Sequence, residues 1–211
     1  KNQIILGLYK AKVDEDIETL RNYIKHLETM LNMYPEEGRL WQFLSIGYMR
    51  TFRMDEVYQA CKKAVEYGVR DMDLYKRYII TQQFRAGDEE RIKTCDDAIK
   101  LYPRECIFYI VKGYSLVNLK EYEKAIETLE KGLKYAKQQS DYIDIYSNLA
   151  EAYYRIENKD KAFEYFEKAL EKDTNNLMVL NNYAYYLCLE NIELDKAEKM
   201  SKQTYDAQSY N

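Results

Sequence analysis

The chain has 211 residues, of which 46% are hydrophobic and 32% charged, and its formal net charge is −4. Two prolines and seven glycines are too few for a turn-rich β fold, whereas this balance of apolar and charged residues suits amphipathic helices. No apolar run approaches the ~18 to 20 residues that a membrane span needs. These features predict an all-α protein without a membrane span in this fragment.

Residues 1–37 read as an incomplete pair of helices. Asn2 can cap a short helix over residues 4–9, and acids at 14–16 suit the start of a second helix, which should end near Pro35. The chain begins with a lysine, so we expect that it is trimmed. The apolar stripe of the second helix consists of Ile17, Leu20, Ile24, Leu27 and Leu31.

Three segments of equal length follow without an insertion, at 38–71, 72–105 and 106–139. Each places apolar and small residues on one face of two successive helices. The matching residues are Trp41, Leu44, Ser45, Tyr48, Val57, Cys61 and Ala64, then Tyr75, Tyr78, Ile79, Cys95 and Ala98, then Tyr109, Gly113, Leu116, Ala125, Leu129 and Gly132.

The pattern is clearest over residues 143–176, after the insertion 140–142. Ala150 and Ala162 mark where two helix backbones must approach closely, and Asn158 can cap the second helix. The two stripes are Tyr146, Leu149, Ala150 and Tyr153, then Ala162, Phe166 and Ala169. Residues 177–211 repeat the pattern less regularly. Their last helix is either a polar cap or the end of a fragment from which a further repeat was removed, and we expect the cap.

This order of aromatic and small residues resembles the tetratricopeptide repeat (TPR), in a bacterial-type tandem array. The resemblance implies a right-handed superhelical solenoid of tandem helix-turn-helix repeats, forming one domain over residues 1–211. The expected units are 1–37, 38–71, 72–105, 106–139, 143–176 and 177–211.

The resemblance also implies a concave groove, lined by the first helix of each unit, that holds a peptide or protein segment. Residues off the packing stripes of the first helices are therefore the candidate binding residues. They are Arg39, Gln42, Ile46, Met49, Arg50, Lys76, Arg77, Ile80, Phe84, Ile107, Ile110, Val111, Tyr114, Asn118, Asn148, Glu151, Tyr154, Arg155, Asn181, Asn182 and Tyr185.

Charge is distributed unevenly among the units. Residues 38–71 carry 6 basic and 4 acidic side chains, whereas residues 140–176 carry 5 and 9. We therefore expect a partner segment with acids at one end and apolar residues after them. A TPR subgroup clamps chaperone tails with Lys, Asn and Arg residues, but Val111 and Asp144 stand where its pattern needs Asn and Lys, so that clamp is not expected.

No constellation for catalysis, metal binding or a cofactor is present. The single histidine, His26, lies on the polar side of its helix, and no phosphate-binding loop or hydrolase motif occurs. Cys61 and Cys95 are 34 residues apart, at equivalent core positions; Cys106 and Cys188 lack a CxxC partner. The sequence therefore predicts a non-catalytic interaction scaffold with no cofactor.

Two alternatives remain open. The chain could associate with itself as a homodimer, or pack within a larger protein as its sensory or assembly part. Nucleic-acid binding is disfavoured by the acidic charge. The compartment stays undetermined: cytoplasmic, or exported if a signal was removed.

Overall fold

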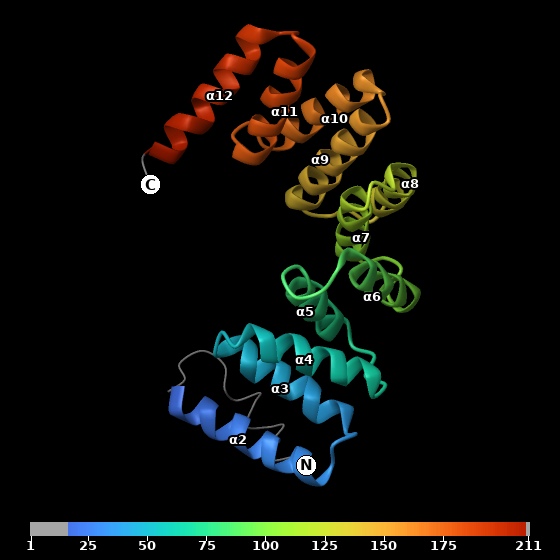
Figure 1. Ribbon diagram of the computed structural model, residues 1–211, viewed down its shortest axis with the longest axis vertical. Helices are drawn as coiled ribbons and strands as arrows, with labels where there is room; N and C mark the ends of the chain where they lie inside the picture. Colours follow the sequence, from blue (N-terminus) through green and yellow to red (C-terminus); the bar gives the residue numbers. More distant parts are fainter. Residues whose placement is uncertain (1–16, 210–211) are drawn as a thin grey trace. The chain divides into compact units, whose positions relative to one another are not determined.

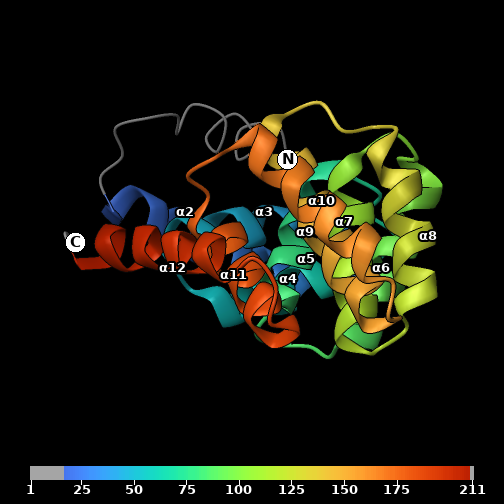
Figure 2. The ribbon, with the colours of Figure 1, turned by 90° about the horizontal axis from the view of Figure 1, so that it is seen from above.

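The computed structural model describes residues 17–209. Within this part of the chain there are eleven α-helices and no β-strand (Figure 1), so the all-α prediction is confirmed. Figure 2 shows the same helices from above. The predicted helix over residues 4–9 and its Asn2 cap lie outside the described residues.

After α2, the helices follow one another as five hairpins: α3–α4, α5–α6, α7–α8, α9–α10 and α11–α12. Predicted unit starts at 38, 72, 106 and 177 are the first residues of α3, α5, α7 and α11. The helices are α2 (Ile17–Met33), α3 (Gly38–Arg50), α4 (Met54–Glu66), α5 (Met72–Gln82), α6 (Asp88–Leu101), α7 (Cys106–Asn118), α8 (Tyr122–Leu133), α9 (Gln139–Arg155), α10 (Lys159–Lys172), α11 (Leu177–Glu190) and α12 (Leu194–Ser209).

The chain divides into two compact units, Lys1–Tyr102 (unit 1) and Pro103–Asn211 (unit 2). The described part of unit 1 holds α2 to α6, and unit 2 holds α7 to α12. A single solenoid over residues 1–211, with the six repeat boundaries given above, remains a prediction.

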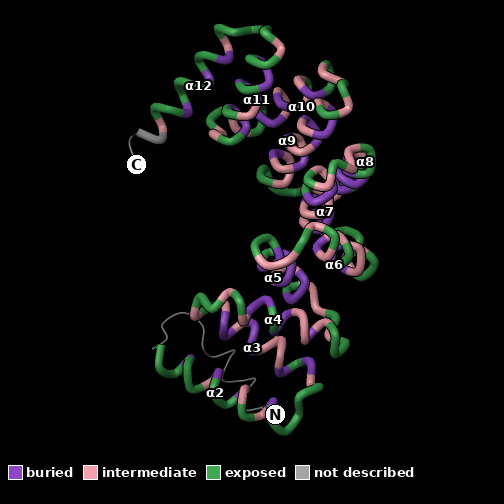
Figure 3. The backbone as a smooth tube through the Cα atoms, viewed as in Figure 1, coloured by how far each residue is buried: buried purple, intermediate pink, exposed green. Residues whose placement is uncertain are grey.

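Each helix has one buried face, and buried and exposed residues alternate along it (Figure 3). In unit 1, α2 buries Leu20, Ile24, Leu27 and Leu31, as predicted, but Ile17 is 62% exposed. Ile17 is the first residue of the helix, so the stripe begins one turn later than its sequence period indicates.

In unit 2 the small residues allow close packing. Ala150 and Ala162 are fully buried between α9 and α10, beside Phe166. A Cβ atom added to Gly113 would clash with the side chain of Leu129, so α7 and α8 also approach closely at a small residue. The Asn158 side chain accepts a hydrogen bond from the Lys161 amide, which confirms the predicted cap of α10.

The insertion at 140–142 is helical rather than a loop. It lengthens α9 at its start, where Gln138 and Asp141 form a capping box. The Asp141 carboxylate accepts hydrogen bonds from the amides of Lys137 and Gln138, at 2.9 and 3.0 Å. The extra residues are therefore absorbed by an earlier helix start.

Candidate partner-binding surface

The predicted binding residues lie on the first helix of each hairpin, except Phe84, which lies in the α5–α6 connection. Their exposure divides them into three groups. Exposed members can contact a partner directly, half-buried members only in part, and buried members not at all. The exposed ones are Arg39, Arg50, Ile80, Phe84, Tyr114, Asn118, Arg155, Asn181 and Tyr185; the half-buried ones are Gln42, Ile46, Met49, Lys76, Arg77, Ile107, Val111, Asn148, Glu151, Tyr154 and Asn182; Ile110 is buried.

Ile110 corrects the prediction of an exposed apolar strip. It is 6% exposed and belongs to a core cluster with Leu149 and Tyr153 of α9. The α7 sequence is apolar on more than one face, so periodicity alone did not show which face meets α9. Tyr114, at 43% exposure, is accessible on the same helix.

Exposed apolar residues remain on the first helices of both units. In unit 1, Ile80 of α5 is 58% exposed, and Phe84 in the connection after α5 is 79% exposed. In unit 2, Tyr185 of α11 is 57% exposed, and Met178 and Leu189 are 53% and 54% exposed. The sequence analysis missed these last two. Their spacing of seven and four residues from Tyr185 was the signal for one exposed helix face.

Tyrosine hydroxyls reach glutamate carboxylates at many of the contacts between helices. Tyr48 of α3 donates to Glu28 of α2 at 2.7 Å, and Tyr153 of α9 donates to Glu130 of α8 at 3.0 Å. Burial, followed by this hydrogen bond, raises the pKa of Tyr153 to about 12. These tyrosines thus serve packing, with a carboxylate satisfying the hydroxyl group.

Three predicted groove residues of α9 are engaged in such contacts with neighbouring side chains. Tyr154 donates to Glu190 at the end of α11, at 2.7 Å, while Glu151 accepts a hydrogen bond from Tyr186 of α11. Arg155 pairs with Glu151 at 2.8 Å on the same helix. These residues join α9 to α11 and neutralise one another, so they present little free charge to a partner.

Arg77 of α5 is likewise turned toward its own unit. Its guanidinium donates to the Ser45 hydroxyl of α3 at 3.1 Å, next to the buried thiol of Cys61. Burial of that thiol raises its pKa to about 11. Arg77 therefore links two first helices, whereas Arg39 and Arg50 are the exposed basic residues of α3.

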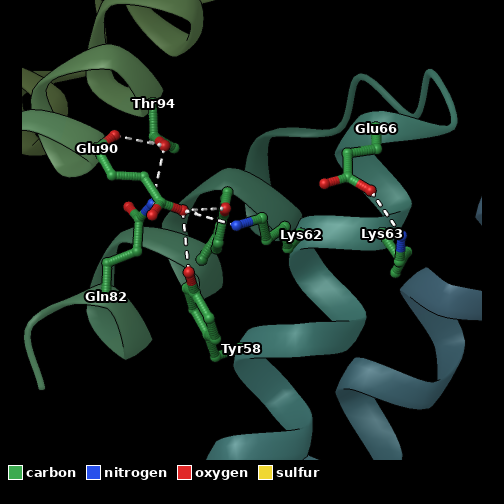
Figure 4. Close-up of polar contacts among 8 residues, drawn as sticks. Tyr58, Lys62, Lys63, Glu66, Gln82, Glu90 and Thr94 are labelled. Carbon is green, nitrogen blue, oxygen red and sulfur yellow. Dashed lines mark hydrogen bonds and ion pairs between the residues drawn. The ribbon is translucent and has the colours of Figure 1, made fainter. Parts of the chain in front are cut away.

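A polar cluster lies where α4, α5 and α6 meet (Figure 4). The Glu90 carboxylate accepts hydrogen bonds from Tyr58 and Tyr78, at 3.0 and 2.9 Å, and lies 3.6 Å from the Lys62 amine. The Gln82 amide donates to Thr94 at 2.9 Å. These contacts hold the second helix of one hairpin to the next hairpin.

Gln82 is fully buried, and its Oε1 atom has no hydrogen-bond partner among the described residues. The orientation of the amide is defined by its neighbours. The Thr94 hydroxyl donates to the Glu90 carbonyl at 3.0 Å, so it must accept from the Gln82 amide nitrogen. An unpaired buried acceptor weakens this part of the core.

Reactive side chains do not converge in the described part of the chain. Cys61, Cys95 and Cys106 are buried, Cys188 is exposed, and none of the four forms a disulfide. His26 is exposed, and its ring Nδ1 makes a hydrogen bond with the Asn22 carbonyl. Among residues 17–209, no group of three or more potential metal ligands comes together, and no helix is long and apolar enough to cross a membrane.

Comparisons with known proteins agree with this architecture. Residues 105–175 match a family model described as tetratricopeptide repeat. The chain is 27% identical over 121 residues to the Hsp70-Hsp90 organising protein of Plasmodium falciparum (isolate 3D7), a match that covers 56% of this chain and 20% of that protein. It is 28% identical over 122 residues to the Photosystem I assembly protein Ycf3 of Synechococcus sp. (strain CC9605), covering 53% and 70%.

A solved structure shows the same fold. YrrB, a TPR protein with an unusual peptide-binding site, aligns with a TM-score of 0.68 at 16% identity, over 78% of this chain and 83% of that one. The chain spans one fifth of the length of the chaperone-organising relative. With the consecutive hairpins described above, these matches identify residues 105–175 as similar to the tetratricopeptide repeat, and the described chain has the fold of a solved protein of that family, whose members typically act as non-catalytic scaffolds for protein interaction or assembly.

Proposed function

We propose that the chain is a non-catalytic scaffold that binds an extended segment of a partner protein along the first helices of its hairpins. The observation that carries this proposal is the exposed apolar face of α11, formed by Met178, Tyr185 and Leu189. Large exposed apolar side chains in a row are typical of an interaction surface. Ile80 and Phe84 extend the proposal to unit 1.

Polar residues beside these faces suit an extended peptide. Asn181 and Asn182 follow one another on α11, between Met178 and Tyr185, and an asparagine amide can donate to and accept from a peptide backbone. Arg39 and Lys76, on α3 and α5, can attract carboxylates of the same partner. These cations of unit 1 therefore suit acidic residues of a partner, and the α11 face of unit 2 suits apolar residues.

The relatives support the class of function but not a particular partner. The names of the two curated relatives describe organisation of two chaperones and assembly of a photosystem, and YrrB is described as having a peptide-binding site. Val111 and Asp144 depart from the pattern of chaperone-tail clamps, so we propose a segment other than such a tail.

Site-specific photocrosslinking tests the proposal. A photoreactive phenylalanine analogue placed at Tyr185 should crosslink to a protein in an extract of the source cell, identified by mass spectrometry. The matched position is Glu164, an exposed residue on the second helix α10, which should give no such product. Equal crosslinking from both positions would contradict binding along the first helices.

The same experiment separates a partner from self-association. A product of twice the chain mass from Tyr185, with concentration-dependent sedimentation of the purified protein, would show that a second copy covers this face. Loss of the crosslink in an Arg39→Glu/Lys76→Glu variant would support acidic residues in the partner. An unchanged crosslink would remove that part of the proposal.

A further inference from the structure

Four hairpins share one turn at the end of their first helix. The residue after the helix end, or the next one, takes a left-handed φ, and the amide that follows reaches back to the carbonyl five residues earlier, as from Arg53 to Tyr48 at 2.9 Å. The left-handed residues are Phe52, Lys120, Glu157 and Asn191, with φ of 56°, 62°, 61° and 56°. Asparagine tolerates this conformation well, whereas a phenylalanine is strained by it.

Phe52 is also 83% exposed, the most of any large hydrophobic residue in the described chain. The local backbone does not favour a phenylalanine at this position, and its ring is not buried in the core of unit 1. An aromatic residue that is both strained and exposed is best accounted for by a contact outside its own chain. Phe52 was not singled out by the periodicity of the sequence, because it lies in a connection.

A cavity of about 750 Å³ adjoins Phe52, between α2 and the α3–α4 turn. Ile17, 62% exposed, and Ile24 give it an apolar part together with the Phe52 ring. Its basic lining residues are Arg21, Lys25, Arg50 and Arg53, and its acidic lining residue is Glu28. The cavity thus combines apolar walls with an excess of positive charge, which suits an anionic ligand with an apolar side chain.

The charges of two lining residues are already engaged within unit 1. Glu28 accepts the Tyr48 hydroxyl at 2.7 Å, and Arg53 pairs with Glu56 at 2.7 Å while lying 4.5 Å from the centre of the Tyr48 ring. Within residues 17–209, no ion pair is recorded for Arg21 or Lys25, which are exposed one helical turn apart on α2. These two cations are therefore available to a ligand.

The neighbouring hairpin adds a second exposed aromatic residue on the same side of unit 1. Phe84, 79% exposed, lies in the α5–α6 connection and directly precedes Arg85. The Arg85 guanidinium pairs with the Asp55 carboxylate at 2.5 Å, which ties this connection to the first turn of α4. Phe52, which lines the cavity, and Phe84 thus lie in the connections of two successive hairpins.

We propose that this cavity docks an acidic segment of a partner protein that carries an aromatic or aliphatic side chain. Carboxylates of the segment meet Arg21 and Lys25, and its apolar side chain packs between Ile17 and Phe52. A concave site encloses a side chain, whereas a flat lipid surface would not fill it. The site shares Arg50 of α3 with the predicted groove but otherwise lies on α2 and the α3–α4 turn. It does not rest on the function proposed for the first-helix faces.

Fluorescence anisotropy with a defined peptide tests the proposal on the full chain. The probe is a fluorescein-labelled peptide in which three aspartates flank one leucine; companion peptides replace the aspartates with asparagine or the leucine with serine. Only the first peptide should bind saturably, and its Kd should rise as NaCl is added. Arg21→Glu/Lys25→Glu should weaken binding about tenfold or more.

The turn offers a matched pair of variants. Phe52→Asn introduces the residue type found at Asn191 in the equivalent turn, so the Tm should stay equal or rise, while peptide binding weakens about fivefold or more. Lys120→Asn introduces the same residue in the equivalent turn of unit 2 and should leave peptide binding unchanged. This pair separates loss of the site from loss of folding.

Three outcomes would overturn the proposal. In the first, the parent chain fails to bind the acidic peptide saturably. In the second, Phe52→Asn binds the peptide as well as the parent does. The third is Phe52-dependent sedimentation with phosphatidylglycerol vesicles without peptide binding, which would assign the site to a lipid surface.

Discussion

The α5–α6 and α9–α10 hairpins occupy the same 34-residue period but are built differently. In α9–α10, the residues at the two close-approach positions are Ala150 and Ala162, both fully buried. At the same positions of the period, α5–α6 carries Ile79 and Arg91. Accordingly, the backbones of α5 and α6 approach each other closely along less of their length than those of α9 and α10. The hydrophobic period makes a hairpin, whereas small residues decide how closely its helices pack.

The interior of α5–α6 contains more polar side chains than that of α9–α10. Thr81, Gln82, Arg91 and Thr94 are all buried there, and the Arg91 guanidinium pairs with Asp88 at the start of α6. A five-residue connection, 83–87, joins the two helices, whereas three residues join α9 to α10. A polar interior depends on partners for each buried atom, so the two hairpins should respond differently to mutation.

The largest effect is expected from moving the arginine into the tight hairpin. Ala162→Arg should lower the free energy of unfolding of unit 2 by about 3 to 5 kcal/mol, because a charge would be buried without a partner. Arg91 pairs with the acidic Asp88 three residues earlier. The residue three positions before 162 is instead the basic Lys159, which is already paired with Glu190. Urea denaturation followed by circular dichroism measures the change.

The reciprocal variant provides the comparison. Arg91→Ala in α6 should cost less, about 1 to 2 kcal/mol, because the surrounding side chains already include polar partners and the Asp88 carboxylate lies at a helix start, where its charge is favoured. If both variants lowered stability equally, the difference between the two interiors would have no energetic consequence.

A smaller effect is expected at the Glu90 cluster. Glu90→Gln should destabilise unit 1 by about 1 to 2 kcal/mol at neutral pH, because Tyr58 and Tyr78 would lose a charged acceptor. The neighbouring Glu89→Gln is the control, since Glu89 is exposed and makes no recorded hydrogen bond within the described residues. Thermal unfolding of both variants beside the parent checks this prediction.

The same carboxylate predicts a pH dependence. Burial acts to raise the pKa of Glu90, but hydrogen bonds from Tyr78 and Tyr58 and the charge of Lys62 outweigh it and hold the pKa below 4.5. The unfolded chain therefore binds the proton more readily, so the stability that this group contributes is present above pH 4.5 and is lost as the pH falls through the folded value. Glu90→Gln should therefore reduce the dependence of the free energy of unfolding on pH in this acidic range. An unchanged dependence would mean that other groups cause it.

The smallest effect has the opposite sign. Gln82→Leu should raise the free energy of unfolding by about 1 kcal/mol, because it removes a buried oxygen without a partner. Leu116 and Leu187 occupy the same position of the period in α7 and α11, where they are buried. A loss of stability would show instead that the donor bonds of the amide outweigh its unpaired oxygen.

The helices and much of the core were predictable from the sequence. The starts of α3, α5, α7 and α11 agree with the predicted units because helix periodicity and capping depend on residues close together in the chain. The burial of Ala150, Ala162 and Phe166 was predicted for the same reason. The start of α9 was missed by four residues, because a capping box at Gln138 outweighed the repeat register.

The binding surface depended on contacts that are distant in sequence. The burial of Ile110 against α9, the pairing of Glu151 with Tyr186 and the attachment of Arg77 to Ser45 each involve residues on separate helices. Periodicity shows that a side chain lies off the packing stripe of its own helix, but not what the next helix brings to it. The tertiary structure therefore decided which predicted binding residues stay accessible, because only packing between helices determines what covers each face.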